Sequence, residues 1–165
     1  MPIFVKNLDN FWKDKLLDHN YARKVYFDAR NFEHLDRNYY PNNRDYIFQS
    51  FNEELDQNIV DQFKKCFDIK EASVSWTLIL PNTILPTHKD SFYTLREKYK
   101  VELDDCFRYL VFLEDWVFGQ YVGFENTDIS RWKAGDVWKF TGEEFHYGIN
   151  ASNFNFHSCQ VSSFS

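Results

Sequence analysis

The sequence lacks paired cysteines, an excess of basic residues and any long hydrophobic run. Its three cysteines, Cys66, Cys106 and Cys159, are odd in number and have no Cys-x-x-Cys spacing, which argues against a disulfide framework and a structural zinc site. The formal net charge of −6 leaves no basic surface for nucleic acid. No stretch of about 18 apolar residues occurs, and the first residues do not follow the pattern of an export signal. We therefore expect a cytoplasmic protein with no nucleic-acid or membrane partner.

The first 70 residues carry mostly helical patterns. A short helix is expected over Asp9 to Asp18, and a strand-like segment follows from Lys24 to Asp28. A second helix is expected from Ser50, where Ser50-Phe51-Asn52-Glu53 fits a capping box. Its apolar stripe, which should pack on a sheet, consists of Phe51, Leu55, Ile59, Phe63 and Phe67.

From Glu71 onward the pattern changes to short strands separated by turns. Helical patterns followed by strands, without alternating β and α units, predict an antiparallel sandwich with helices on one side. We therefore expect a mainly β (α+β) fold in one domain over 1–165, with buttressing helices over about 1–70 and the β core over about 71–165. The expected strands are Ala72 to Leu80, Cys106 to Leu113, Gln120 to Glu125, Asp136 to Phe140 and Phe154 to Val161.

Two histidines and one aspartate stand out as candidate metal ligands. His88 and Asp90 follow a β-rich run and its turn residues, and His146 lies 58 residues later. Two neutral imidazoles and a carboxylate on one face of an octahedral Fe(II) leave three positions open for chemistry. A His-x-Asp triplet alone is weak, because a second one, His34-Leu35-Asp36, lies in a polar stretch that we interpret as a surface loop.

The residues around these candidates strengthen the assignment. Tyr109 to Leu113 is a strand-like run that leads into Glu114-Asp115-Trp116, and Trp132-Lys133-Ala134-Gly135-Asp136 precedes Phe145-His146. In this order and spacing, the segments from about Ser73 to Val161 resemble the 2-oxoglutarate/Fe(II)-dependent oxygenases, in particular the small bacterial and phage-type members related to prolyl and aspartyl/asparaginyl hydroxylases.

The resemblance implies a double-stranded β-helix, a cupin-like jelly roll. It also implies that His88, Asp90 and His146 are catalytic ligands of Fe(II), and that Gly135-Asp136 forms the turn that starts the strand of the distal histidine. The implied activity is a dioxygenase reaction that hydroxylates a C–H bond while 2-oxoglutarate is decarboxylated to succinate. A peptide side chain, an amino acid and a small metabolite all remain open as the substrate.

The chain departs from the family at the co-substrate anchor. Family members usually place an arginine about ten residues after the distal histidine, where it pairs with the far carboxylate of 2-oxoglutarate. Here Phe156 and His157 stand in that region. A buried carboxylate needs a cationic partner, so Arg108 is the first candidate for co-substrate binding and Lys139 the second, while His157 could donate a hydrogen bond. Each of these residues could instead have only a structural role.

The missing arginine leaves two alternatives open. The chain could be a non-catalytic jelly-roll binding module, or a cupin-like metalloenzyme that does not use 2-oxoglutarate. Residues Ser91 to Tyr99 form either a substrate-facing loop or short helix, or a solvated connection. Four aromatic residues could line a pocket or belong to the core: Trp76, Tyr93, Phe112 and Trp138.

Overall fold

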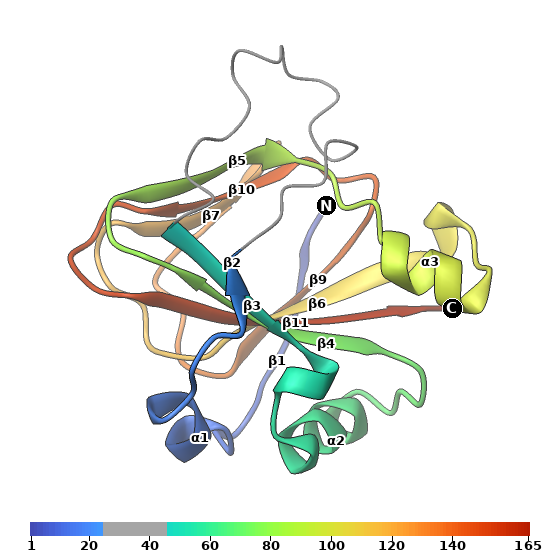
Figure 1. Cartoon of the computed structure of the whole chain (residues 1–165). Helices are drawn as coiled ribbons and strands as arrows, with labels where there is room; N and C mark the ends of the chain where they lie inside the picture. Colours follow the sequence, from blue (N-terminus) through green and yellow to red (C-terminus); the bar gives the residue numbers. More distant parts are fainter. Residues whose placement is uncertain (25–45) are drawn as a thin grey trace.

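Two antiparallel sheets face each other in the computed structural model, which describes residues 1–24 and 46–165 (Figure 1). The larger sheet has the strand order β1-β9-β6-β11-β4-β3-β2, and the smaller one the order β5-β10-β7-β8. The expected jelly-roll, double-stranded β-helix fold is confirmed. No helix within the described ranges is long and apolar enough to cross a membrane.

The larger sheet is built mostly from the strands that the sequence pattern predicts. β4, β6, β9 and β11 fall where strands were expected, although β11 begins two residues later and continues three residues further. The strands are β1 (Ile3–Asn7), β2 (Arg23–Lys24), β3 (Ile47–Phe51), β4 (Ser73–Ile79), β6 (Cys106–Phe112), β9 (Asp136–Thr141) and β11 (Phe156–Phe164).

The smaller sheet contains only one strand that the hydrophobic pattern revealed, β7. Its strands are β5 (Thr83–His88), β7 (Gln120–Phe124), β8 (Thr127–Ile129) and β10 (His146–Asn150). β5 contains Pro86, which cannot donate a ladder hydrogen bond, and it is accordingly an edge strand. The proline that made this segment look like a turn in the sequence therefore marks the border of the sheet.

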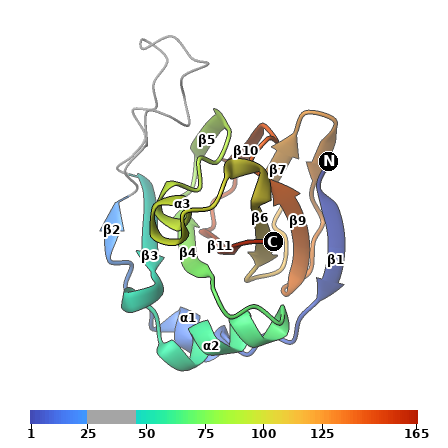
Figure 2. The same ribbon diagram turned by 90° about the vertical axis from the view of Figure 1, so that its right-hand side faces the viewer.

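Helices α1 (Lys13–Leu17) and α2 (Gln57–Cys66) cover the outer face of the larger sheet, as expected (Figures 1 and 2). Trp12 and Phe63 are fully buried there and stack with ring centroids 5.5 Å apart. Full burial of a side chain of this size contributes about 2 to 3 kcal/mol. The remaining helical segments are α3 (Tyr93–Tyr99) and the 3-10 turns η4 (Asn52–Glu54) and η5 (Leu103–Asp105).

The expected helix start at Ser50 is wrong. Ser50 and Phe51 end β3 and pair with Trp76 and Ser75 of β4, because a β-strand partner satisfies their backbone groups. The helix begins after Asp56, whose carboxylate accepts from the amides of Asn58 and Ile59 at 3.0 and 3.3 Å.

Two further expectations need adjustment, and two others lie wholly or partly outside the described residues. The helix expected over Asp9 to Asp18 spans only Lys13–Leu17. Of the segment from Lys24 to Asp28, only Lys24 is described, as the end of β2, and His34-Leu35-Asp36 lies outside the described residues. The N-terminal 70 residues do more than buttress, since they add β1, β2 and β3 to the larger sheet.

The turn at Gly135-Asp136 starts β9 and not the strand of the distal histidine, which is β10. Gly135 has φ +91°, and a Cβ at this position would lie 2.0 Å from the carbonyl oxygen of Leu8. Only glycine tolerates both conditions. The turn therefore holds the start of β9 against Leu8, which directly follows β1. The histidine begins β10, the next strand along the chain, which lies in the smaller sheet.

Period-two alternation gives the larger sheet two different faces. On β4 and β11, the outward side chains Val74, Trp76, Cys159 and Val161 join the core under α1 and α2. The inward side chains of the same strands face the smaller sheet and line a cavity. The site described next lies at the edge of this cavity.

Candidate metal centre

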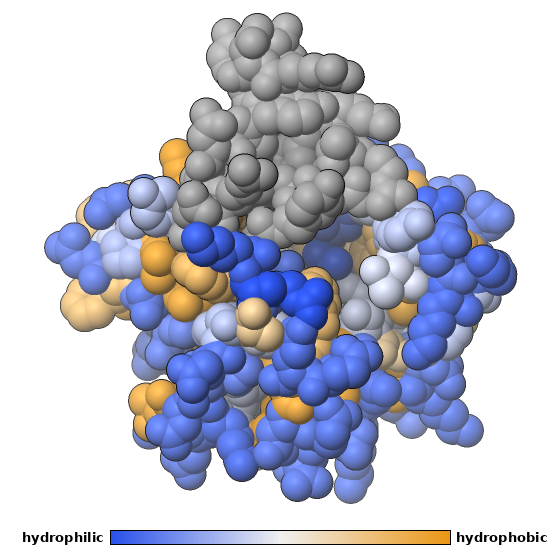
Figure 3. All heavy atoms as spheres, in the orientation of Figure 1, coloured by the Kyte–Doolittle hydropathy of each residue, from blue (hydrophilic) through white to orange (hydrophobic). Residues whose placement is uncertain are grey.

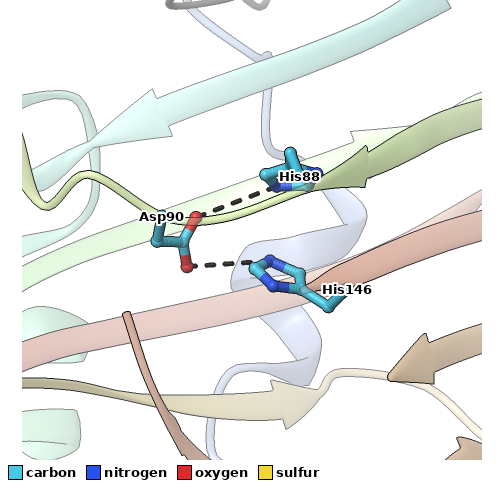
Figure 4. A group of neighbouring side chains, drawn as sticks. All are labelled: His88, Asp90 and His146. Carbon is cyan, nitrogen blue, oxygen red and sulfur yellow. Dashed lines mark ion pairs between the residues drawn. The ribbon is translucent and has the colours of Figure 1, made fainter. Parts of the chain in front are cut away.

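His88, Asp90 and His146 converge although 58 residues separate the two histidines. His88 is the last residue of β5, His146 is the first of β10, and the two are register partners of neighbouring strands. Asp90 lies two residues beyond the end of β5. Figure 4 shows the three side chains pointing toward one another. One ligand atom from each lies within 4.8 Å of the others, and this is the one group of its kind among the residues that the structure describes.

The distances suit a shared ion. His88 Nε2 lies 3.8 Å from Asp90 Oδ1, and His146 Nε2 lies 3.7 Å from Asp90 Oδ2. All three side chains are at least nine-tenths buried. Because metal–ligand bonds of this donor set are about 2.0 to 2.2 Å long, ligand atoms that share an ion must lie this near to one another.

The hydrogen bonds of both rings set the tautomer that a ligand needs. His88 Nδ1 lies 2.7 Å from the carbonyl oxygen of Pro86, and His146 Nδ1 lies 3.0 Å from that of Glu144. A carbonyl oxygen only accepts, so each Nδ1 carries the proton and donates it. The lone pair of each neutral ring is then on Nε2, the atom that faces Asp90.

Burial and neighbouring charges favour the ligating protonation states of His88 and Asp90. Burial, followed by the neighbouring His146, lowers the pKa of His88 to about 4, so the ring is neutral near pH 7. Burial alone would raise the pKa of Asp90, but the charge of Arg108, with smaller electrostatic effects from His146 and His88, lowers that pKa. The site therefore presents a neutral His88 ring and an Asp90 carboxylate, with Nε2 of His146 facing that carboxylate.

Arg108 of β6 approaches the carboxylate from the side of the larger sheet. Its Nη1 lies 2.7 Å from Asp90 Oδ2, and its Nε donates to Ser162 Oγ at 3.0 Å. Asp90 Oδ2 is nevertheless a buried oxygen without a hydrogen bond of ordinary geometry. The short contact is therefore chiefly an ion pair, and the oxygen retains lone pairs for a cation. This donor set, buried and incompletely hydrogen-bonded, fits a divalent metal such as Fe(II).

The three candidate ligands border a cavity of about 750 Å³ between the two sheets. This volume lies in the range of small-molecule sites. Hydroxyl, amide and charged groups line part of it, and aliphatic and aromatic side chains line the rest. The apolar part contains Ile47, Ile79, Leu85, Leu110, Val122, Phe140 and Phe156.

Of the three candidates for co-substrate binding, the structure places Arg108 at the cavity and the other two elsewhere. Lys139 lies on the opposite face of the larger sheet, with Nζ 4.0 Å from the centroid of the Phe107 ring. His157 also faces the outer layer, where the hydroxyl of Tyr21 lies 2.8 Å from its Nδ1. Neither residue lines the cavity.

Of the four aromatic residues expected to line a pocket or to belong to the core, one lies at the cavity and three do not. Tyr93 lines the cavity, whereas Trp76 belongs to the outer core, Phe112 stacks on Trp132 at 3.9 Å in the inner core, and Trp138 packs on Phe4. The segment from Ser91 to Tyr99 contains α3, and its first five residues border the cavity.

Sequence reasoning missed a group of polar residues on the inner face of the larger sheet. They are Gln49 on β3, Ser75 and Thr77 on β4, and Ser158 and Gln160 on β11. The signal was present as Ser73-Val74-Ser75-Trp76-Thr77, in which polar and apolar residues alternate. Such alternation usually marks a solvated outer face, and in this sheet the polar face is the inner one.

No protein-family model matches the sequence, and no curated protein matches it significantly. Solved structures match in fold. A prolyl-4-hydroxylase from Pseudomonas putida superimposes with a TM-score of 0.52 at 13% identity, over 70% of this chain and 69% of that one. A predicted oxalate decarboxylase from Thermotoga maritima superimposes with a TM-score of 0.45 at 16% identity, over 72% of this chain and 81% of that one. A cupin protein from Bacteroides fragilis superimposes with a TM-score of 0.45 at 11% identity, over 71% of this chain and 76% of that one. At these identities the likeness concerns the fold.

Proposed function

We propose that this protein is a mononuclear Fe(II) oxygenase that uses 2-oxoglutarate as its co-substrate and hydroxylates a small molecule or side chain held in the cavity. The observation that supports this most strongly is the buried His88, Asp90 and His146 set at the edge of a cavity large enough for two small ligands. Hydroxylation is also the reaction named for the Pseudomonas putida structure of similar fold.

In this proposal the three ligands hold iron, and the bound iron supplies the oxidising chemistry. The carbonyl oxygens of Pro86 and Glu144 fix the orientation of the two rings through their Nδ1 protons. The apolar walls around Leu110, Val122 and Phe140 keep bulk water away from the reacting centre.

Arg108 is the residue proposed to bind a carboxylate of the co-substrate. Among the described residues that line the cavity, it is the one lysine or arginine. Its guanidinium has five N–H donors, and the contacts at Asp90 and Ser162 use only part of them. A co-substrate carboxylate at this position would sit beside the metal ligands and would have a charge partner.

Anaerobic spectroscopy tests the proposal. Fe(II) is added to the metal-free protein, followed by 2-oxoglutarate, and the visible absorption is recorded. We expect a charge-transfer band only when both are present, and no band in the His146→Ala variant. The His157→Gln variant serves as the control, because it removes a histidine outside the cavity and should keep the band.

A second candidate, a metalloenzyme that does not use 2-oxoglutarate, is favoured by one observation. Arg108 is paired with Asp90, and the wall around Phe156, which stands near the usual place of the family arginine, is apolar. Tight metal binding without the band would favour this candidate. A chain that binds neither iron nor 2-oxoglutarate would be a non-catalytic binding module.

A further inference from the structure

The inner face of the larger sheet carries a stripe of hydrogen-bonding side chains that the metal site does not use. This polar stripe consists of Gln49, Ser75, Thr77, Ser158 and Gln160, and all five line the cavity. Register places Gln49, Thr77 and Ser158 in one row across β3, β4 and β11, and Ser75 beside Gln160 in the next row.

The polar stripe contrasts with the apolar outer face of β4 and β11. The side chains that point outward next to the stripe on these two strands are Val74, Trp76, Cys159 and Val161, all at most 1% exposed. A sheet face that only packs against another sheet would be apolar in the same way. Polar side chains on the inner face, lining the same cavity as the candidate metal ligands, are the composition of a ligand-binding wall.

The stripe is organised as a connected hydrogen-bond network. Gln49 Nε2 donates to Thr77 Oγ1 at 3.2 Å, and Thr77 Oγ1 donates to Gln160 Oε1 at 2.7 Å. Gln160 Nε2 then donates to Ser158 Oγ at 2.7 Å. Ser158 still has a hydroxyl proton to donate, and each amide has a second N–H. The network therefore fixes side-chain orientations and offers both donors and acceptors toward the cavity.

The distribution of charge limits what can bind there. Every charged or titratable side chain among the described cavity residues, apart from the phenols of Tyr93 and Tyr147, belongs to the group formed by His88, Asp90, Arg108 and His146. A charged substituent against the stripe would find no counter-charge beside it among these described residues, and an unpaired charge in a cavity is unfavourable. An apolar substituent would leave the donors and acceptors of the network unmatched.

We propose that the stripe is a substrate subsite for a neutral group with neighbouring hydrogen-bond donors and acceptors, either a carboxamide or a polyol. The inference deepens the proposed function, on which it rests for the identity of the reacting centre. The substrate lies along β4 and β11 through this group, while Arg108 and the metal ligands serve the co-substrate. The apolar wall at Ile79 and Phe156 then contacts the carbon skeleton.

Titration calorimetry on the protein loaded anaerobically with Fe(II), with and without 2-oxoglutarate, tests the subsite. Two matched pairs of probes distinguish a carboxamide from a polyol. L-Glutamine is compared with L-norleucine, and xylitol is compared with 1-pentanol. We expect one polar probe to bind more tightly than its apolar counterpart. Binding by L-glutamine identifies a carboxamide, and binding by xylitol identifies a polyol.

Variants of the stripe residues test whether the probes bind at the polar stripe. Thr77→Val and Ser158→Ala should each weaken binding of the preferred probe about tenfold, which corresponds to one hydrogen bond. Thr77→Ser keeps the hydroxyl and should restore most of the affinity, which separates binding from folding. Thr141→Val, on the exposed end of β9, is the matched control and should bind like the wild type.

The proposal is overturned if the apolar probes bind as tightly as the polar ones, if Thr77→Val behaves like Thr141→Val, or if neither polar probe binds. Heat of binding is measured independently of the charge-transfer band. Probe binding without the band would therefore contradict the use of 2-oxoglutarate but not the subsite. The band without probe binding would contradict the subsite but not the use of 2-oxoglutarate.

Discussion

The partly buried Arg108 and the buried Asp90 form an ion pair, 2.7 Å between Nη1 and Oδ2, between the larger sheet and the candidate metal ligands. The guanidinium also lies 5.2 Å from the ring of Phe92 and donates to Ser162. One residue on β6 therefore compensates the charge of a carboxylate that a metal would otherwise compensate. This arrangement predicts that arginine and metal support the fold interchangeably.

Replacing Arg108 by methionine should destabilise the metal-free protein by about 3 kcal/mol, because it leaves a buried carboxylate without a counter-charge. Zn²⁺, which has no redox chemistry, should recover much of this loss by neutralising Asp90. Urea unfolding with and without the metal measures both effects. Arg108→Lys retains the positive charge and should be less destabilised. Equal stability of Arg108→Met and wild type without metal would contradict the account.

Acid should destabilise the metal-free protein through two buried histidines. Burial is the main cause that lowers the pKa of both His88 and His157 to about 4. A histidine whose pKa is lower in the folded state than in the unfolded state binds fewer protons when folded. The contribution of these two histidines to stability is therefore complete above the unfolded pKa of about 6.5, falls by up to about 1.4 kcal/mol per pH unit for each histidine, and levels off below about pH 4.

The His157→Gln variant separates the two contributions. It removes one titrating group away from the cavity, so its free energy of unfolding should fall less steeply than that of the wild type between about pH 6.5 and pH 4. Urea unfolding at several pH values measures the two slopes. Parallel slopes would mean that His157 is not held neutral by burial.

Gly135→Ala should destabilise the fold by about 2 kcal/mol, since it combines a positive φ with a backbone clash. The amide of Leu8 also donates to the carbonyl oxygen of Gly135 at 2.8 Å, so the change should loosen β1 from β9. Gly148→Ala is the comparison, because its new Cβ would meet the end of the Ile79 side chain at 3.3 Å and Cβ of Leu85 at an ordinary contact distance of 3.8 Å. Urea midpoints that shift equally in both variants would contradict this.

Four strands of the larger sheet, β4, β6, β9 and β11, could be predicted because most of their outward side chains are apolar, as Val74 and Val161 illustrate. β10 could not, because His146-Tyr147-Gly148-Ile149-Asn150 has neither clear alternation nor β-branched enrichment. The supposed helix start at Ser50 failed because a capping pattern is local, whereas pairing with β4 is a tertiary contact. Local sequence therefore located the strands that form a core and missed those that complete the site.

The cluster of candidate metal ligands could be predicted because residue type, order and flanking motifs agree. The position of Lys139 and His157 outside the cavity could not, because a one-residue offset on a strand moves a side chain to the opposite face. Arg108 lies on the inner face of β6 and Lys139 on the outer face of β9, and only the strand register distinguishes the two.

The most direct test of the central claim is the number of ferrous ions that the chain binds. Anaerobic equilibrium dialysis against Fe(II), followed by metal analysis, should give one iron per chain for the wild type and His157→Gln, and none for Asp90→Ala or His146→Ala. Far-UV circular dichroism verifies that each variant is folded. Iron retained equally by folded His146→Ala, or absent from the wild type, would contradict a metal centre formed by His88, Asp90 and His146.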